Sequence, residues 1–149
     1  MKLVVQRVNS ACVKINNEKC ADIDKGLLVL FGAEKGDDRN FCQYLANKTV
    51  NLRIFEDENG KMGKSVKDIE GEIIIVSQFT LAGNCKKGLR PDFTGAMAPE
   101  DAKIIYEDFV EHCRSELGNK KVQTGQFAAD MKVGLENDGP VTIILEKRS

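Results

Sequence analysis

The chain has 149 residues, with 22 lysines and arginines against 23 aspartates and glutamates, and its formal net charge is -1 at pH 7. A chain of this length can bury a sizeable core, so we expect one domain over residues 1–149, and the near-zero charge excludes a protein that coats nucleic acid, which needs a basic surface. No apolar run approaches the roughly 20 residues that span a bilayer, so we expect no membrane segment.

The cysteines and the histidine narrow the chemistry further. Five cysteines stand at 12, 20, 42, 85 and 113 and form no C-x-x-C pair, which predicts neither a disulfide framework nor a zinc site. We therefore expect a reducing, cytoplasmic setting, no metal and no cofactor. The single histidine, His112, lies beside the apolar stripe of a predicted helix, and we expect it to be a packed or partly exposed helix residue and not a catalytic base.

The first predicted strand runs from Lys2 to Ile15. Leu3, Val5 and Val13 share one parity along it, which is the period-2 pattern of a half-buried strand. Arg7 has that same parity, and two interpretations follow. A bulge or strand end lets the guanidinium reach water, or the side chain points inward near a site and is satisfied by carbonyls or a carboxylate, because a buried unpaired cation is too costly.

The next elements alternate between strands, a helix and turns. A hairpin turn is predicted at residues 16–19, and a strand begins at Gly26. Asp37 or Asp38 is suited to cap a helix that continues to about Leu52. The polar residues 55–71 predict a surface excursion with a hairpin at Asn59-Gly60.

The second half of the chain adds a central strand, a helix and a tail of strands. The strand is predicted from Glu72 to Thr80, and the helix begins at Pro99 and stops at Gly118. Strands are predicted at residues 121–127, 130–136 and 141–147, with a turn at residues 137–140. The fold class is therefore α+β, a mixed and largely antiparallel sheet with a barrel-like core and two main helices.

The exit of the central strand is the first place to look for chemistry. Alternation puts Gln78 and Thr80 on one face, and Ser77 on the other unless the strand twists there. The hydroxyls either bond to neighbouring backbone or belong to a site. Such a site suits hydrolysis of an activated ester, because backbone N–H groups at a strand exit can hold the oxyanion, although a threonine hydroxyl without a base is a weak nucleophile.

Two further segments carry candidate residues. Cys85, next to the cations Lys86 and Lys87, is a minor alternative nucleophile as a thiolate. Lys86, Lys87 and Arg90 either form a solvated loop or grip one or two phosphates. The residues 137–142, NDGPVT, read as a turn before a strand, and only about 5–6% of X–Pro bonds in folded proteins are cis.

The segments Ser77–Leu81 (SQFTL) and Asn137–Thr142 (NDGPVT) together resemble the S-Q-F-T-L and N-x-G-P-x-T motifs of the D-aminoacyl-tRNA deacylase family. The likeness extends over essentially the whole chain, through VVQRVNSACV, GLLVLFG, KKGLRPDFTGAMAPEDA and TGQFAADMKV in the order of the family. Either motif alone is weak, but two at matching separation are specific.

The resemblance implies a cytoplasmic homodimer that hydrolyses the ester between a D-amino acid and the 3′-terminal adenosine of tRNA and that rejects L-aminoacyl substrates. Because glycine has no Cβ, we also expect some cleavage of glycyl-tRNA. The implied catalytic pocket consists of Ser77, Gln78, Phe79 and Thr80. The glycine–proline peptide of the family is cis and reaches into the partner's pocket as a chiral filter, which here means Gly139 and Pro140. The residues that we further assign to substrate binding are Arg7, Phe127, Met131, Lys87 and Arg90.

Two residues depart from the family pattern. Ala128 stands where a glycine is expected and would tighten the pocket wall near Phe127 and Met131. Leu89 stands where a polar residue is more usual, and it bears on contacts with the tRNA body. Two other functions remain open: a non-catalytic nucleic-acid-binding module that uses the loop 86–90, and an esterase for small metabolites with Thr80 or Cys85 as its nucleophile.

Overall fold

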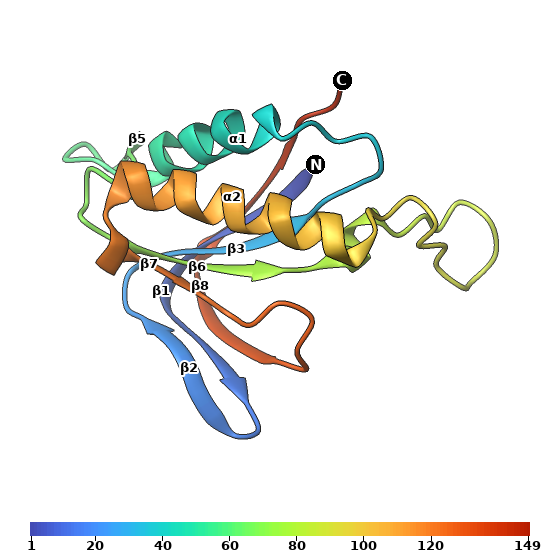
Figure 1. Cartoon of the computed structure of the whole chain (residues 1–149). Helices are drawn as coiled ribbons and strands as arrows, with labels where there is room; N and C mark the ends of the chain where they lie inside the picture. Colours follow the sequence, from blue (N-terminus) through green and yellow to red (C-terminus); the bar gives the residue numbers. More distant parts are fainter.

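A computed structural model describes residues 1–149, with two helices packed on one face of a curled sheet (Figure 1). The helices are α1 (Asn40–Asn51) and α2 (Pro99–Leu117). The sheet consists of β1 (Lys2–Ile15), β2 (Glu18–Ile23), β3 (Gly26–Gly32), β6 (Glu72–Ser77), β7 (Val122–Thr124) and β8 (Lys132–Glu146). The short strands β4 (Phe55–Glu56) and β5 (Met62–Lys64) form the predicted hairpin, and η1 (Phe79–Ala82) and η2 (Asn119–Lys121) are single 3₁₀ turns. The α+β, barrel-like expectation is confirmed.

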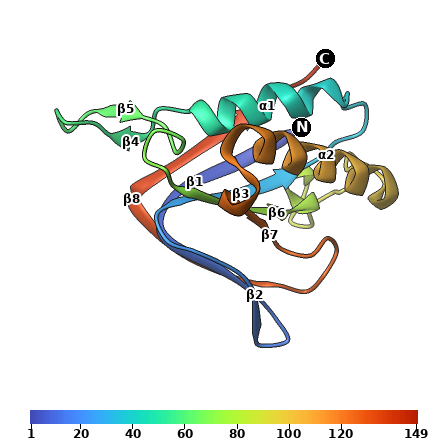
Figure 2. The same cartoon turned by 60° about the vertical axis from the view of Figure 1, so that its left-hand side comes forward.

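The sheet has an antiparallel half and a parallel half. Its order is β2-β1-β3-β6-β7, and β8 also pairs with β1. β1 is antiparallel to β2, β3 and β8, whereas β3, β6 and β7 are parallel. The irregular alternation of predicted elements did not indicate the parallel half. It exists because α1 and α2 supply the long crossovers that parallel strands require (Figure 2).

The main core lies between the helices and the sheet. Phe41 and Leu45 of α1, and Phe109 of α2, are buried there against Leu3 and Val5 of β1, because each helix turns one apolar stripe toward the sheet. A smaller cluster fills the inside of the curl on the other face of the sheet. Its members are Val8, Ala11, Val13, Ala21, Ile23, Leu28, Ile74 and Val76. No helix combines the length and the apolar character that a bilayer crossing demands.

The central strand ends earlier than predicted. β6 stops at Ser77, Gln78 N–H donates one more bond to the Phe31 carbonyl at 2.7 Å, and the chain then turns into η1. The alternation drawn through Thr80 was therefore wrong. Gly32 permits this turn, because a Cβ at that position would lie 3.0 Å from the Gln78 carbonyl oxygen.

The predicted turn at residues 137–140 was also wrong, because these residues lie inside β8. Gln6 pairs with Thr142 and Val8 with Asn137, so Arg7 alone stands opposite the four residues 138–141, which form a bulge. The Gly139–Pro140 peptide in this bulge is cis. The Asn137 side chain closes the bulge, since its Oδ1 accepts from Val141 N–H at 2.8 Å.

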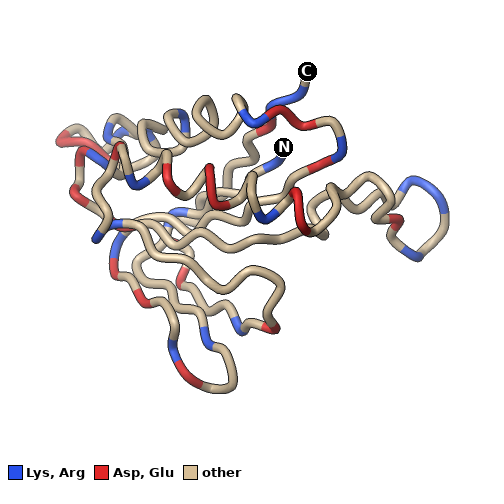
Figure 3. Tube along the Cα trace, viewed as in Figure 1, with Lys and Arg blue, Asp and Glu red and all other residues tan.

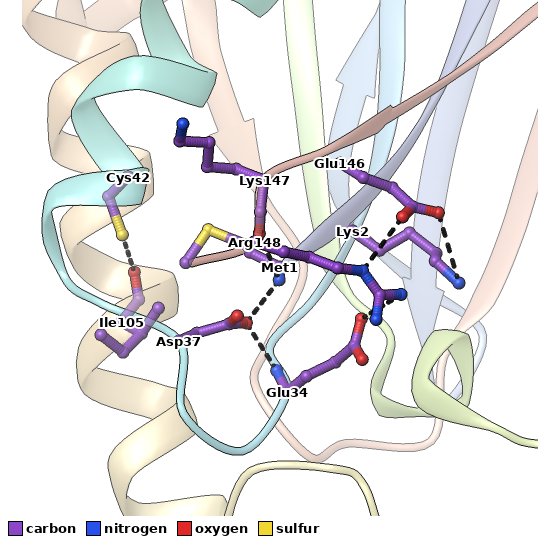
Figure 4. Close-up of polar contacts among 9 residues, drawn as sticks. All are labelled: Met1, Lys2, Glu34, Asp37, Cys42, Ile105, Glu146, Lys147 and Arg148. Carbon is purple, nitrogen blue, oxygen red and sulfur yellow. Dashed lines mark hydrogen bonds and ion pairs between the residues drawn. The ribbon is translucent and has the colours of Figure 1, made fainter.

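The start of α1 differs from the predicted cap. Its N-cap residue is Arg39 and makes no capping bond, while Asp38 Oδ1 accepts from Asn40 N–H at 2.7 Å. Asp37 turns inward, where its Oδ2 lies 2.6 Å from the α-ammonium of Met1 and 2.7 Å from the N–H of Glu34 (Figure 4). The aspartates thus organise the entry to α1 and attach it to the N-terminus of the chain.

Candidate active site

A cavity of about 640 Å³ lies where the parallel strands β3, β6 and β7 end. Ligand sites of open α/β sheets favour this position, because the carboxyl ends of parallel strands release loops that can surround a ligand. The lining is mostly apolar. The lining residues are Phe31, Ala33, Ser77, Gln78, Phe79, Phe93, Ala96, Met97, Ala98, Pro99, Ala102, Phe127, Ala128, Ala129, Asp130, Met131 and Val133.

The exit of β6 forms one wall. Ser77, Gln78 and Phe79 all line the cavity, because the chain turns immediately after Ser77. Thr80 is exposed and does not line it; Gln78 Nε2 donates a hydrogen bond to Thr80 Oγ1 at 2.6 Å. The N–H groups of Phe79 and Thr80 precede the first bond of the 3₁₀ turn, from Leu81 N–H to the Gln78 carbonyl, and so have no partner within the turn.

A second wall comes from the loop between β7 and β8, of which residues 127–131 line the cavity. Phe127 rests on the ring of Tyr106, whose hydroxyl donates to the Ile75 carbonyl at 2.8 Å and whose pKa is raised by burial. A Cβ on Gly125 would lie 2.5 Å from Met131 Sδ, so glycine there lets the methionine approach. The fold therefore brings Phe127 and Met131, assigned from sequence, to the same cavity as Ser77–Phe79.

Ala128 has an unusual backbone conformation in that wall. Ala129 N–H donates to the Gln126 carbonyl at 3.2 Å, and Ala128, the third residue of this turn, has φ of 63°. Turns with positive φ at this place favour glycine or asparagine. Ala128, which stands where the family pattern has glycine, therefore places a methyl group on the cavity wall. Its backbone lies in a region that L-residues rarely adopt.

Arg7 and the bulge of β8 form a second group outside the cavity lining. Arg7 is 7% exposed, and its Nη1 donates to the Ile54 carbonyl at 2.7 Å while its Nε donates to the Asp138 carbonyl at 2.9 Å. The inward interpretation of Arg7 holds, and the one in which its guanidinium reaches water was wrong. Gly139 and Pro140, beside it, are exposed.

The third group lies on a loop that projects from the body of the protein (Figure 1), and the residue after this loop, Phe93, lines the cavity. We call residues 84–92 the arm. Lys87 and Arg90 are exposed on it, as is Cys85, and none of the three lines the cavity. Figure 3 shows lysine and arginine at its tip.

His112 lies away from all three groups. Its Nε2 is 3.5 Å from Asp108 Oδ2, and Asp108 Oδ1 is 3.0 Å from Arg39 Nη2. The hydrogen bond and charge of Arg39 hold the pKa of Asp108 below its usual range. Burial raises the pKa of the neighbouring Cys42 to about 12, which keeps its thiol neutral. His112 is half-buried on α2, as expected.

Sequence reasoning missed the lining residues that come from the segment after the arm and from the start of α2. They are Phe93, Ala96, Met97, Ala98, Pro99 and Ala102. A signal was present for Phe93, because an aromatic residue in a polar loop is unusual. Its ring packs edge-to-face on Phe79 with 5.3 Å between centroids.

Fold and cavity together define an α+β domain with a ligand cavity at the exits of parallel strands. A family model described as D-Tyr-tRNA(Tyr) deacylase matches residues 4–146. The chain belongs to this family. A D-aminoacyl-tRNA deacylase of Thermosipho melanesiensis is 55% identical over 148 residues, covering 99% of this chain and 98% of the relative. One of Clostridium novyi is 49% identical with the same coverage.

Two solved structures share the architecture. One, titled c-Myc DNA Unwinding Element Binding Protein, is 43% identical with a TM-score of 0.95 and covers 100% of both chains. The other, titled as a probable eukaryotic D-amino acid tRNA deacylase, has a TM-score of 0.83 at 17% identity and covers 97% of both chains. At that identity the second likeness concerns the fold alone.

Proposed function

We propose that this protein hydrolyses the ester that joins a D-amino acid to the 3′-terminal adenosine of tRNA, in the cytoplasm where aminoacyl-tRNA is used. The observation that carries the proposal is the cavity that gathers Ser77, Gln78 and Phe79 of the family motif with Phe127 and Met131. Its apolar walls suit the faces of a nucleoside and the polar strand exit suits the ester. The names of the relatives agree with this substrate.

The ester carbonyl is placed at the first turn of η1. Water or a hydroxyl attacks it, and the N–H groups of Phe79 and Thr80 stabilise the negative charge that develops on the carbonyl oxygen. Thr80 Oγ1 is hydrogen-bonded to the amide of Gln78, which does not act as a base. We therefore assign the activation of the attacking group to the 2′-hydroxyl of the terminal adenosine.

Two measurements separate this mechanism from a covalent one. A substrate that ends in 2′-deoxyadenosine is expected to react much more slowly, and an unchanged rate would eliminate a role for the 2′-hydroxyl. If Thr80 were the covalent nucleophile, Thr80→Ala would abolish turnover. We expect that variant to retain activity, and Cys85→Ser likewise.

We assign the selection of handedness to the Gly139–Pro140 backbone of a second copy of the chain. Carbonyls of this bulge accept hydrogen bonds from the substrate α-ammonium, and the surrounding backbone leaves no room for an L-side chain. Two features of β8 support this assignment. The strand pairs with β1 alone, so its other edge is free, and its apolar side chains Val133, Leu135 and Ile144 are exposed. A second copy of the chain can pack against this edge and these side chains. Glycine has no Cβ, so glycyl-tRNA is also cleaved.

Matched D- and L-aminoacyl-tRNAs, with glycyl-tRNA as a third substrate, test the function directly. The D-ester and the glycyl ester are expected to decay and the L-ester to persist. Loss of the L-ester at the same rate would refute chiral selection. Turnover of free amino-acid esters without RNA would instead identify an esterase for small metabolites.

Complementation tests the shared site. Met131→Trp blocks the cavity and Gly139→Val disturbs the filter, and each variant alone is expected to be inactive. In a refolded mixture, half of the dimers are mixed and each mixed dimer has one intact site, so about a quarter of the parental activity should return. Light scattering confirms that the refolded mixture contains dimers. If such a mixture recovers no deacylation activity, the filter and the cavity of one site belong to the same chain.

A second candidate function is DNA binding, because the 43% identical structure is titled as a DNA-element-binding protein. The net charge of -1 weighs against it, since duplex binding neutralises many phosphates. A salt titration of duplex DNA affinity tests it. A steep fall of log affinity with log salt at submicromolar affinity would favour this candidate, whereas the deacylase should bind duplex DNA weakly.

A further inference from the structure

The arm, residues 84–92, is closed at its base by hydrogen bonds. Asn84 N–H donates to the Asp92 carbonyl at 2.8 Å, and Asp92 N–H donates to the Asn84 carbonyl at 2.9 Å. Asn84 Oδ1 accepts from Lys86 N–H at 2.9 Å, and Asp92 Oδ1 accepts from Thr94 N–H at 2.9 Å. The base of the arm is therefore closed on both sides by hydrogen bonds.

The arm is also attached to the cavity wall. Phe93, directly after it, packs on Phe79, and a Cβ on Gly83 would lie 2.9 Å from the Phe93 ring. Phe79 and Phe93 both line the cavity. The base of the arm therefore adjoins the cavity, and its tip lies at most nine residues along the chain from a lining residue.

The tip presents an unusual combination of side chains. Leu89 is 104% exposed, the most exposed large apolar side chain of the chain. Lys86, Lys87 and Arg90 surround it, and none of them has a salt-bridge partner, although the protein as a whole carries a net charge of -1. An apolar side chain among unpaired cations is complementary to a polyanion that also offers apolar faces, which single-stranded nucleic acid does through its bases.

We propose that the arm docks on the single-stranded 3′ end of tRNA, with Leu89 packed against a base and the three cations on the backbone phosphates. This inference rests on the proposed function, because the terminal adenosine is placed in the cavity. From Asn84 to Leu89 the chain reaches at most about 17 Å. A stacked strand advances about 3.4 Å per nucleotide, so this length is enough for the tip to reach the unpaired nucleotides that precede the adenosine.

The two parts of the arm have different signatures in a salt titration of binding to uncharged tRNA. Each phosphate contact with a single strand contributes a slope of about -0.7 to log K against log salt. Lys86→Gln with Lys87→Gln is expected to weaken binding and to make the slope shallower by about 1.4. Leu89→Ser is expected to weaken binding about tenfold, which corresponds to about 1.4 kcal/mol, with an unchanged slope.

Matched variants control for charge and for apolar surface. Lys67→Gln with Lys120→Gln removes two exposed lysines that have no salt bridge and lie outside the arm, and Met62→Ser removes an apolar side chain that is 53% exposed on the β4–β5 hairpin. Both controls should bind tRNA like the parent. If Leu89→Ser binds like Met62→Ser, or if the two double variants have equal slopes, the proposal is wrong.

Kinetics separates the arm from the reaction. Leu89→Ser should raise KM for D-aminoacyl-tRNA about tenfold and leave kcat unchanged, and it should not affect turnover of D-aminoacyl-adenosine, which is too short to reach the arm. If the protein deacylates nothing while Leu89→Ser still weakens tRNA binding, the proposed function is wrong and the proposed role of the arm in binding tRNA is retained.

Sedimentation with phosphatidylglycerol vesicles should show no binding of the protein. If the protein bound these vesicles through Leu89 while its tRNA affinity did not depend on Leu89, the arm would bind a membrane surface and the proposal would be wrong.

Discussion

Arg7 on β1 holds the bulge of β8 in place through the Asp138 carbonyl, at 2.9 Å from its Nε, while its Nη1 holds the Ile54 carbonyl at 2.7 Å. The side chain is almost fully buried, and the Asp138 carboxylate lies 3.6 Å from the same Nε. One guanidinium therefore joins β1 to the bulge and to the segment after α1. The planar fork of arginine permits this, because it offers several donors in fixed directions.

Arg7→Lys keeps the charge but removes the fork, so at least one buried carbonyl loses its donor. We expect the free energy of unfolding to fall by about 2 kcal/mol and deacylation to fall at least tenfold. Urea unfolding and a deacylation assay measure the two effects. Arg53→Lys is the control, because exposed Arg53 also donates from Nε to a carbonyl, that of Gly63 at 2.9 Å. Equal stability of the two variants would contradict the role given to Arg7.

Asp37 is expected to be the most sensitive carboxylate for stability. It lies 2.6 Å from the Met1 α-ammonium, both groups are nearly inaccessible, and it also accepts from Glu34 N–H (Figure 4). Asp37→Asn leaves a buried cation without its counter-charge and should cost about 3–5 kcal/mol in urea unfolding. Asp38→Asn keeps the bond to Asn40 N–H and should cost less than about 0.5 kcal/mol. A similar loss in both variants would show that the ion pair is not the cause.

Ala128→Gly should have two effects: it relieves backbone strain, and it removes a methyl group from the cavity wall. Ala128 has φ of 63°, and glycine adopts this region without a steric penalty, so we expect the melting temperature to rise by about 2–4 °C, which corresponds to about 1 kcal/mol. Loss of the methyl group from the cavity wall should raise KM about threefold. Glu70→Gly, at φ of 55° and outside the cavity lining, should give the same thermal gain with unchanged KM. If the Glu70 variant changed KM, or if the Ala128 variant left KM unchanged, the methyl group on the cavity wall would not be the cause of the change in KM.

Asp108 should make a small contribution to stability that depends on pH. Its pKa is lowered by the hydrogen bond and charge of Arg39, so its stabilising effect is complete above the ordinary aspartate pKa of about 3.9 and is lost as pH falls through the lowered value. Asp108→Asn should lower the melting temperature by about 1–3 °C at pH 7, because Arg39 is largely exposed and the pair is screened. The difference should shrink as pH falls below about 3.9 and close once the pH lies below the lowered pKa of Asp108. A difference that does not shrink as pH falls below about 3.9 would contradict an ionic origin.

Much of the architecture could be predicted from local pattern. The second helix begins at Pro99 and ends before Gly118 as the helix signals require, and α1 lies within one or two residues of its predicted span. Asn16 and Asn17 have φ of 52° and 66°, the conformation of a tight hairpin turn, which asparagine tolerates. These features depend on residues near one another in sequence, so the sequence indicates them.

The failures have a common cause in contacts between distant segments. β6 ends at Ser77 because Gln78 bonds to Phe31 on β3 and Gly32 makes room for the turn, and neither relation is local. The NDGP segment, a turn by its composition, stays within β8 because the bulge is filled by Arg7, some 130 residues earlier. Turn propensity is a weak preference, and pairing along a 15-residue strand outweighs it.

The sequence by itself determined the helices, most strands, the family motifs and the candidate site residues, because periodicity and turn chemistry act over a few residues. Only the tertiary structure decided that Ser77, Gln78, Phe79, Phe127 and Met131 share one cavity while Thr80 lies outside it. Likewise, only the packed sheet decided that Arg7 is buried against the bulge and that the arm stands beside the cavity with Leu89 exposed. Side-chain direction at a strand exit depends on where neighbouring strands stop pairing, and that is a property of the whole sheet.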